Sequence, residues 1–118
     1  WVTGSEYEWT QHWRIALGLG LTESDLAGVR EWRDHPDFGP AERAVLAAVD
    51  ETLADGRIGD DTWDACLGHV SSDPRVLLEV ISVVGVWGMV AAQLRTIGVP
   101  LEEGVAPWPP DGDGPRLR

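Results

Sequence analysis

A glutamate and a histidine one helical turn apart, Glu8 and His12, are the residues whose types and spacing best fit acid–base chemistry. On a helix, residues three, four and seven positions apart share a face, so Ser5, Glu8 and His12 are expected to form one stripe. The Glu8 carboxylate would then accept a hydrogen bond from the imidazole, fix its tautomer and stabilise its protonated form. The stripe predicts a group that gives and takes a proton.

Aromatic and basic residues surround this pair along the sequence. Three aromatic side chains would wall a small substrate pocket and exclude water: Tyr7, Trp9 and Trp13. Arg14, or an arginine of a neighbouring subunit, would hold a substrate carboxylate through two parallel hydrogen bonds. Ion pairs on helix surfaces have the same Glu/His spacing, so the pair by itself fits a solvated surface as well as a catalytic site.

Three further residues with reactive or metal-binding side chains fit structural roles better. Cys66 is the only cysteine, which excludes an intrachain disulfide, and it is expected to be a small buried hydrophobe. His69 shares a helix face with Cys66, but two ligands fall short of the four that a closed zinc site uses. His35 stands in a turn and is expected to be solvated. We therefore predict no metal site.

The sequence also lacks the motifs that bind nucleotide cofactors. It contains no Gly-x-Gly-x-x-Gly motif, no phosphate-binding loop and no Gly-x-Ser-x-Gly motif. The pair Gly18 and Gly20 is a helix stop. We expect a protein without cofactors.

The elements that must position these residues are helices. Capping residues, prolines and glycines delimit five apolar-periodic segments, and no alternating strand pattern of any length is present. The expected helices cover residues 3–17, 22–33, 40–54, 60–70 and 74–97. A capping box at Thr3–Glu6 would begin the first helix, and Thr22–Asp25 would open the second. The sequence therefore predicts an all-α fold.

The segment 74–97 is apolar on nearly every side and is expected at the centre of the domain or at a subunit interface. A membrane span is the alternative, but Glu79, Gln93 and Arg95 leave an uncharged stretch shorter than the roughly 20 residues that a bilayer requires. Residues 105–118 are rich in proline and glycine and form a tail. Trp108 would pin this tail to the body or to a neighbouring subunit, or the tail is loosely held.

Composition limits the partners and the compartment. The formal net charge is −11 and all nine basic residues are arginines, so a continuous positive track for nucleic acid is hard to build and anionic membranes are repelled. The lone cysteine and the lack of a signal peptide favour the cytoplasm. Seven tryptophans and an apolar helix in 118 residues offer more apolar surface than one short domain hides, which predicts a homo-oligomer.

The run SEYEWTQHWRIA at residues 5–16, followed by Gly18, Leu21 and Thr22, resembles a stretch of the carboxymuconolactone decarboxylase family. In that stretch a helix carries a functional histidine, and a Gly-Leu-Thr turn leads into the next helix. Residues 77–102 are similar to the family's long last helix and closing segment. The resemblance covers roughly residues 5–104, so we expect one family domain over residues 1–104, without the family's N-terminal helices. It implies an alkyl hydroperoxidase D-like bundle of about five helices, assembled as trimers or hexamers.

The peroxidase branch of this family carries a Cys-x-x-Cys pair and a histidine four residues beyond it. Ser5 and Glu8 stand at the two cysteine positions of this pair, and His12 stands at that of the histidine. Serine and glutamate form neither a disulfide nor a sulfenic acid, so thiol peroxidase chemistry is excluded here. That branch also uses an upstream glutamate, whose position would fall before Trp1.

Two functions follow from the resemblance. The first is a cofactor-independent enzyme of the carboxymuconolactone decarboxylase type, in which His12 moves a proton on a small carbonyl, lactone or carboxylate substrate and Glu8 orients the imidazole. The alternative is a non-catalytic oligomeric binding or scaffold protein that kept the fold and lost the cysteines. The surroundings of His12 separate the two, because an enzyme needs this histidine in a pocket.

Overall fold

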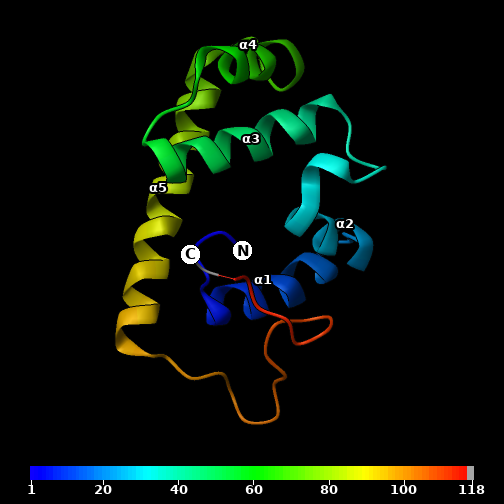
Figure 1. Ribbon diagram of the computed structural model, residues 1–118, viewed down its shortest axis with the longest axis vertical. Coiled ribbons are helices and arrows are strands. Elements are labelled where there is room, and N and C mark those ends of the chain that lie inside the picture. Colours follow the sequence, from blue (N-terminus) through cyan, green and yellow to red (C-terminus); the bar gives the residue numbers. More distant parts are fainter. Residues whose placement is uncertain (117–118) are drawn as a thin grey trace. The chain divides into compact units, whose positions relative to one another are not determined.

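The computed structural model describes residues 1–116, and all regular structure in that range is helical (Figure 1). Its α-helices are α1 (Glu6–Gly18), α2 (Glu23–Gly28), α3 (Pro40–Asp55), α4 (Asp60–His69) and α5 (Pro74–Ile97). A 3₁₀ helix, Val29–Asp34, lies between α2 and α3. Residues 1–116 contain no strand, so the all-α fold class is confirmed.

A capping box begins α2, and the one expected at the start of α1 is absent. The Thr22 hydroxyl accepts a hydrogen bond from the Asp25 backbone N–H at 3.1 Å, and the Asp25 carboxylate accepts one from the Thr22 backbone N–H at 3.1 Å. The box at Thr3–Glu6 was wrong: Ser5 is the residue that caps α1, and its side chain makes no capping hydrogen bond. Gly4, with a φ of 64°, sits in a turn closed onto the Trp1 carbonyl, so Thr3 lies outside the helix start.

The helix expected over residues 22–33 is interrupted. α2 ends at Gly28, and Glu31 leaves helical geometry with φ −132° and ψ 46°. The Arg43 guanidinium, from α3, donates to four backbone carbonyls beyond this break, which gives these oxygens a side-chain partner where a continuing helix would supply amides. These carbonyls belong to Trp32, Arg33, His35 and Phe38. A long-range side chain thus shapes the segment.

The chain forms two compact units. The first contains residues 1–31 and the chain from Met89 onward, and the second is Trp32–Gly88. In the second unit α3 packs against α4 (Figure 1). Its core consists of buried residues from α3, α4 and the start of α5: Ala44, Ala48, Cys66 and Leu77. In the first unit the buried residues are Ser5, Thr10, Trp13, Gly28 and Ala91.

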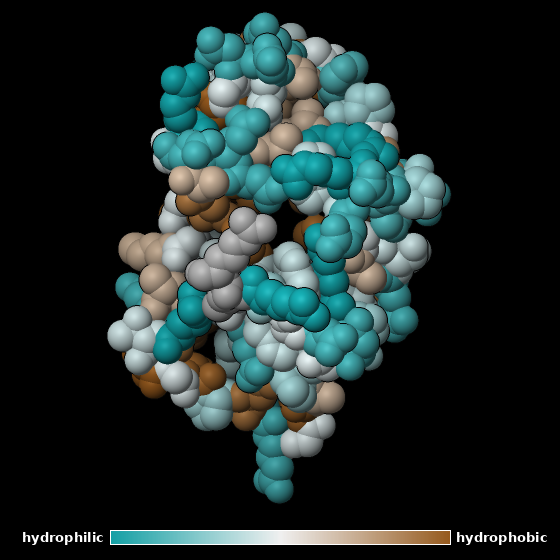
Figure 2. All heavy atoms as spheres, viewed as in Figure 1, coloured by the Kyte–Doolittle hydropathy of each residue, from teal (hydrophilic) through white to brown (hydrophobic). Residues whose placement is uncertain are grey.

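The long helix α5 is confirmed over Pro74–Ile97, but it is not the buried centre of the protein. Only 11% of an 18-residue apolar stretch within this helix is buried. Val83, Val86 and Met89 are each more than half exposed, and Figure 2 shows apolar residues at the surface over this helix. α5 is long and apolar enough to cross a membrane, judged by length and composition alone. The core helices of soluble proteins can be equally long and apolar.

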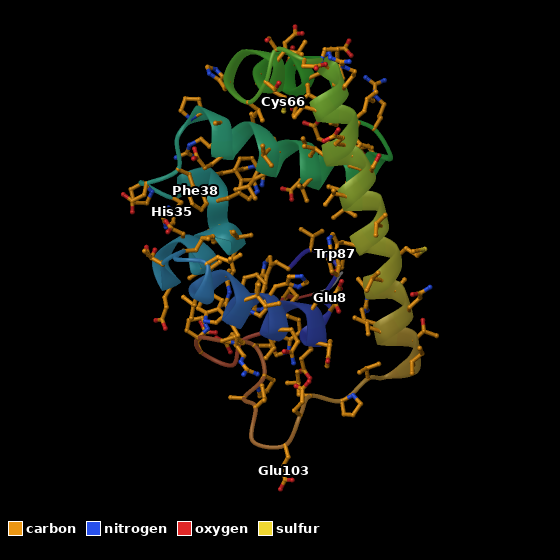
Figure 3. The ribbon with its side chains drawn as sticks, turned by 180° about the vertical axis from the view of Figure 1, so that it is seen from behind. Glu8, His35, Phe38, Cys66, Trp87 and Glu103 are labelled. Carbon is orange, nitrogen blue, oxygen red and sulfur yellow. The ribbon has the colours of Figure 1, made fainter. Side chains whose placement is uncertain are left out.

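The C-terminal segment returns beside α1 within the first unit (Figure 1). The Trp9 indole N–H donates to the Pro109 carbonyl at 2.8 Å, and the Trp108 backbone N–H donates to the Thr10 hydroxyl at 3.2 Å. The loop between α5 and this segment is exposed, with Glu103 at its tip (Figure 3). Of the alternatives left open by the sequence, Trp108 pinning the tail to the body of the protein is the one observed.

Candidate acid–base site on helix α1

His12 lies exposed on α1 and has a defined hydrogen bond. Its Nδ1 lies 2.9 Å from the backbone carbonyl oxygen of Glu8, one turn earlier. A carbonyl oxygen only accepts, so Nδ1 must carry the hydrogen and donate it. In the neutral ring this leaves the lone pair on Nε2, which is the state that a general base requires. The helix backbone therefore fixes the tautomer of His12.

Glu8 and Ser5 occupy different surroundings from His12. The Nδ1 hydrogen bond goes to the Glu8 backbone oxygen, whereas the Glu8 carboxylate was the acceptor expected from the sequence. Glu8 is half-buried on α1 (Figure 3). Ser5 is 3% exposed, and its hydroxyl has no hydrogen-bond partner among residues 1–116. The expected stripe thus runs from a buried hydroxyl to an exposed imidazole.

Tyr7 and Arg14 face a carboxylate that sequence reasoning missed. Glu102 accepts hydrogen bonds from the Tyr7 hydroxyl at 3.1 Å and from the Gln11 side-chain amide at 2.6 Å. The pKa of Glu102 is lowered by its own backbone N–H, by these two side chains and by the charge of Arg14. Tyr7 is thereby tied to the loop after α5. No local pattern signals a pairing across 95 positions of sequence.

Trp9 and Trp13 belong to an indole cluster. The rings of Trp9 and Trp13 lie 5.7 Å apart, and Trp1 lies 5.1 Å from Trp9 on centroid distances. The Arg30 guanidinium stacks at 4.6 Å from the Trp1 ring and at 5.2 Å from the Trp9 ring. Arg30 also bonds both oxygens of the Asp111 carboxylate, at 2.9 and 2.8 Å. Arg30 therefore binds a carboxylate of the same chain, a role that was not expected from the sequence.

The residues set aside as structural lie in the second unit. Cys66 is 2% exposed, its thiol donates to the Ala44 carbonyl at 3.4 Å, and burial followed by the charge of Glu51 raises its pKa. Its interpretation as a buried hydrophobe is confirmed (Figure 3). The His35 ring is half-buried and packs against Phe38, with centroids 4.3 Å apart, so it is less solvated than expected. His69 is exposed.

Comparison with known proteins bears on the first part of the chain. Searches of curated proteins and of solved structures gave no match. The family description that matches is "Carboxymuconolactone decarboxylase family", over residues 1–51. This match contains α1, α2 and most of α3, and it confirms the resemblance read from the sequence. Residues 1–51, which carry His12, are thus similar to the carboxymuconolactone decarboxylase family.

Proposed function

We propose that this protein is a cofactor-independent proton-transfer enzyme of the carboxymuconolactone decarboxylase type, with His12 as the group that moves the proton. The substrate class is a small carbonyl, lactone or carboxylate compound. The observation that carries the proposal is the hydrogen bond from Nδ1 of His12 to the Glu8 carbonyl at 2.9 Å, inside the family segment. It holds Nε2 ready to accept or return a proton.

In a decarboxylation, the bond between the substrate carbon and its carboxylate breaks and CO₂ leaves. The electron pair stays on the carbon, where conjugation with a carbonyl or lactone stabilises it. Protonated His12 then delivers a proton from Nε2 to a carbon of this conjugated system and becomes neutral. Because the Nδ1 hydrogen bond is kept in both charge states, the ring need not turn between the two steps.

The direct test is turnover of carboxymuconolactone by the wild-type chain in D₂O, followed by NMR. We expect the carboxyl carbon to be released as CO₂ and one deuterium to appear on a carbon of the lactone product. The reaction should exceed the rate in buffer at equal pH. A product formed at the buffer rate would instead support the non-catalytic binding or scaffold role, which the exposure of His12 on α1 favours.

We further propose that copies of the chain associate through α5. The helix exposes Val83, Val86 and Met89 at 54, 53 and 55%. Exposed apolar surface of this kind commonly marks a protein contact. A trimer or hexamer would bury it, as the family resemblance implies.

Sedimentation velocity tests this association. We expect the wild-type chain to run at a multiple of its 12.9 kDa protomer mass, and Val83→Glu to shift it to the protomer because a buried unpaired charge is costly. Ser82→Glu is the matched control on the same helix, since Ser82 is exposed and polar and the variant should leave the mass unchanged. A wild-type protein that already runs as a protomer in aqueous buffer would contradict the proposal.

A further inference from the structure

Arg30 is prepared to bind a carboxylate. Its side chain is 13% exposed, and its guanidinium lies over the rings of Trp1 and Trp9. Cation–π contacts of this kind hold a guanidinium plane in place and are stronger where water is excluded. The Nη2 group donates to the Pro109 carbonyl at 2.7 Å, so it is anchored separately from the carboxylate-binding Nη1. The arginine is therefore ordered and partly desolvated.

The carboxylate that Arg30 binds is more loosely held than the arginine. The Asp111 side chain is 49% exposed, against 13% for Arg30. Besides Nη1 of Arg30, the carboxylate accepts the Asp113 backbone N–H at 3.0 Å, within the same turn of the tail. The tail also has anchors that do not involve Asp111, since Trp9 and Thr10 bond the backbone of Pro109 and Trp108. Asp111 can therefore leave Arg30 while the rest of the tail stays bound.

A carboxylate from another molecule would be able to bind Arg30 in the same way once Asp111 has moved away. It would find a fixed guanidinium that offers charge-assisted hydrogen bonds, with two neighbouring indole rings beside it for an apolar or aromatic body. The tail competes from within the chain, at an effective concentration in the millimolar range for a short connection. Weak external ligands would therefore bind to the site only when Asp111 has dissociated from Arg30.

We propose that Arg30 and the indoles of Trp1 and Trp9 form a binding site for small aromatic carboxylates, and that Asp111 occupies it as an internal competitor. The inference is independent of proton transfer at His12, because it concerns binding at Arg30 and its test requires no turnover. The site lies wholly within the first unit.

Benzoate is a suitable probe, with benzyl alcohol as its uncharged counterpart. Asp111→Asn removes the competing charge at an exposed position and should leave the fold intact. We expect Asp111→Asn to bind benzoate with a Kd about tenfold or more below that of the wild type, because the internal competitor is gone. The indole N–H signals of Trp1 and Trp9 report the binding by NMR. Benzyl alcohol should give no saturable shift.

The double variant Arg30→Lys with Asp111→Asn tests the role of the guanidinium. Lysine keeps the charge but lacks the plane that lies over the indoles and the second nitrogen that bonds Pro109, so benzoate affinity should fall at least tenfold relative to Asp111→Asn. In the wild-type chain, benzoate in excess should shift the Asp113 amide signal as Asp111 is displaced, which needs no variant. Equal benzoate affinity with and without Arg30, or no benzoate binding to Asp111→Asn, would show that the ion pair only fastens the tail.

Discussion

Replacing His12 by glutamine should lower kcat/KM for carboxymuconolactone by about 100- to 10,000-fold, the usual contribution of a general acid–base residue. Glutamine keeps the size and polarity of the side chain but neither accepts nor releases a proton at neutral pH. Because His12 is exposed, the free energy of unfolding should change little, which separates a loss of chemistry from a loss of fold. NMR of product formation measures the rate.

His69→Gln is the matched control for this experiment. His69 is also exposed at the surface of a helix, but it lies in α4 of the second unit, outside residues 1–51. It should leave kcat/KM unchanged. If both variants lose activity alike, or if His12→Gln retains full activity, proton transfer by His12 is refuted.

The tautomer of His12 provides a check that does not depend on a substrate. Nitrogen-15 NMR of the neutral ring should show the hydrogen on Nδ1, as required by donation to the Glu8 carbonyl. Glu8→Gln should keep this tautomer, because the accepting oxygen belongs to the backbone. A neutral His12 with its hydrogen on Nε2 would contradict the geometry on which the proposed function rests.

Replacing Arg43 by methionine should lower the free energy of unfolding by about 2–4 kcal/mol, since hydrogen bonds to a charged group contribute about 1.5–3 kcal/mol each and orphaned carbonyls are costly. Methionine keeps the aliphatic length of the side chain but donates nothing. Four carbonyls lose the guanidinium as a donor, and those of Trp32 and His35 still accept a backbone N–H at 3.4 Å each. Urea denaturation followed by circular dichroism gives the change.

Arg57→Met controls for the loss of a surface arginine. Arg57 makes one exposed ion pair with Asp60 at 3.3 Å, with side chains 68 and 98% exposed. Exposed pairs of this kind contribute little, so this variant should shift the free energy of unfolding by no more than about 0.5 kcal/mol. Equal effects of the two substitutions would mean that the Arg43 hydrogen bonds do not stabilise the connection between α2 and α3.

Local sequence signals were sufficient for most helix boundaries. Thr22 and Asp25 begin α2 as a capping box, Pro40 stands at the first position of α3, and Gly56 ends it with a φ of 71°. These signals work because a cap needs only neighbouring residues to satisfy the free amides and carbonyls of a helix end. The family segment around His12 could also be recognised, since its residues are contiguous.

The break after Gly28 could not be predicted, because its cause lies in another element. The Arg43 guanidinium supplies donors to carbonyls beyond the break, and nothing within residues 22–33 signals them. The exposure of α5 could not be predicted either, because an apolar helix has the same composition whether it lies in a core or at an interface.

Local sequence patterns were enough to predict the helical fold class, the ends of the later helices and the resemblance of the segment that carries His12 to a known family. Tertiary structure decided which partner each functional side chain meets: the Glu8 backbone for His12, Glu102 for Tyr7, and Asp111 for Arg30. The reason is physical. Helix periodicity places residues on a face, but a contact across 81 or 95 positions depends on where the chain returns, which no local pattern specifies.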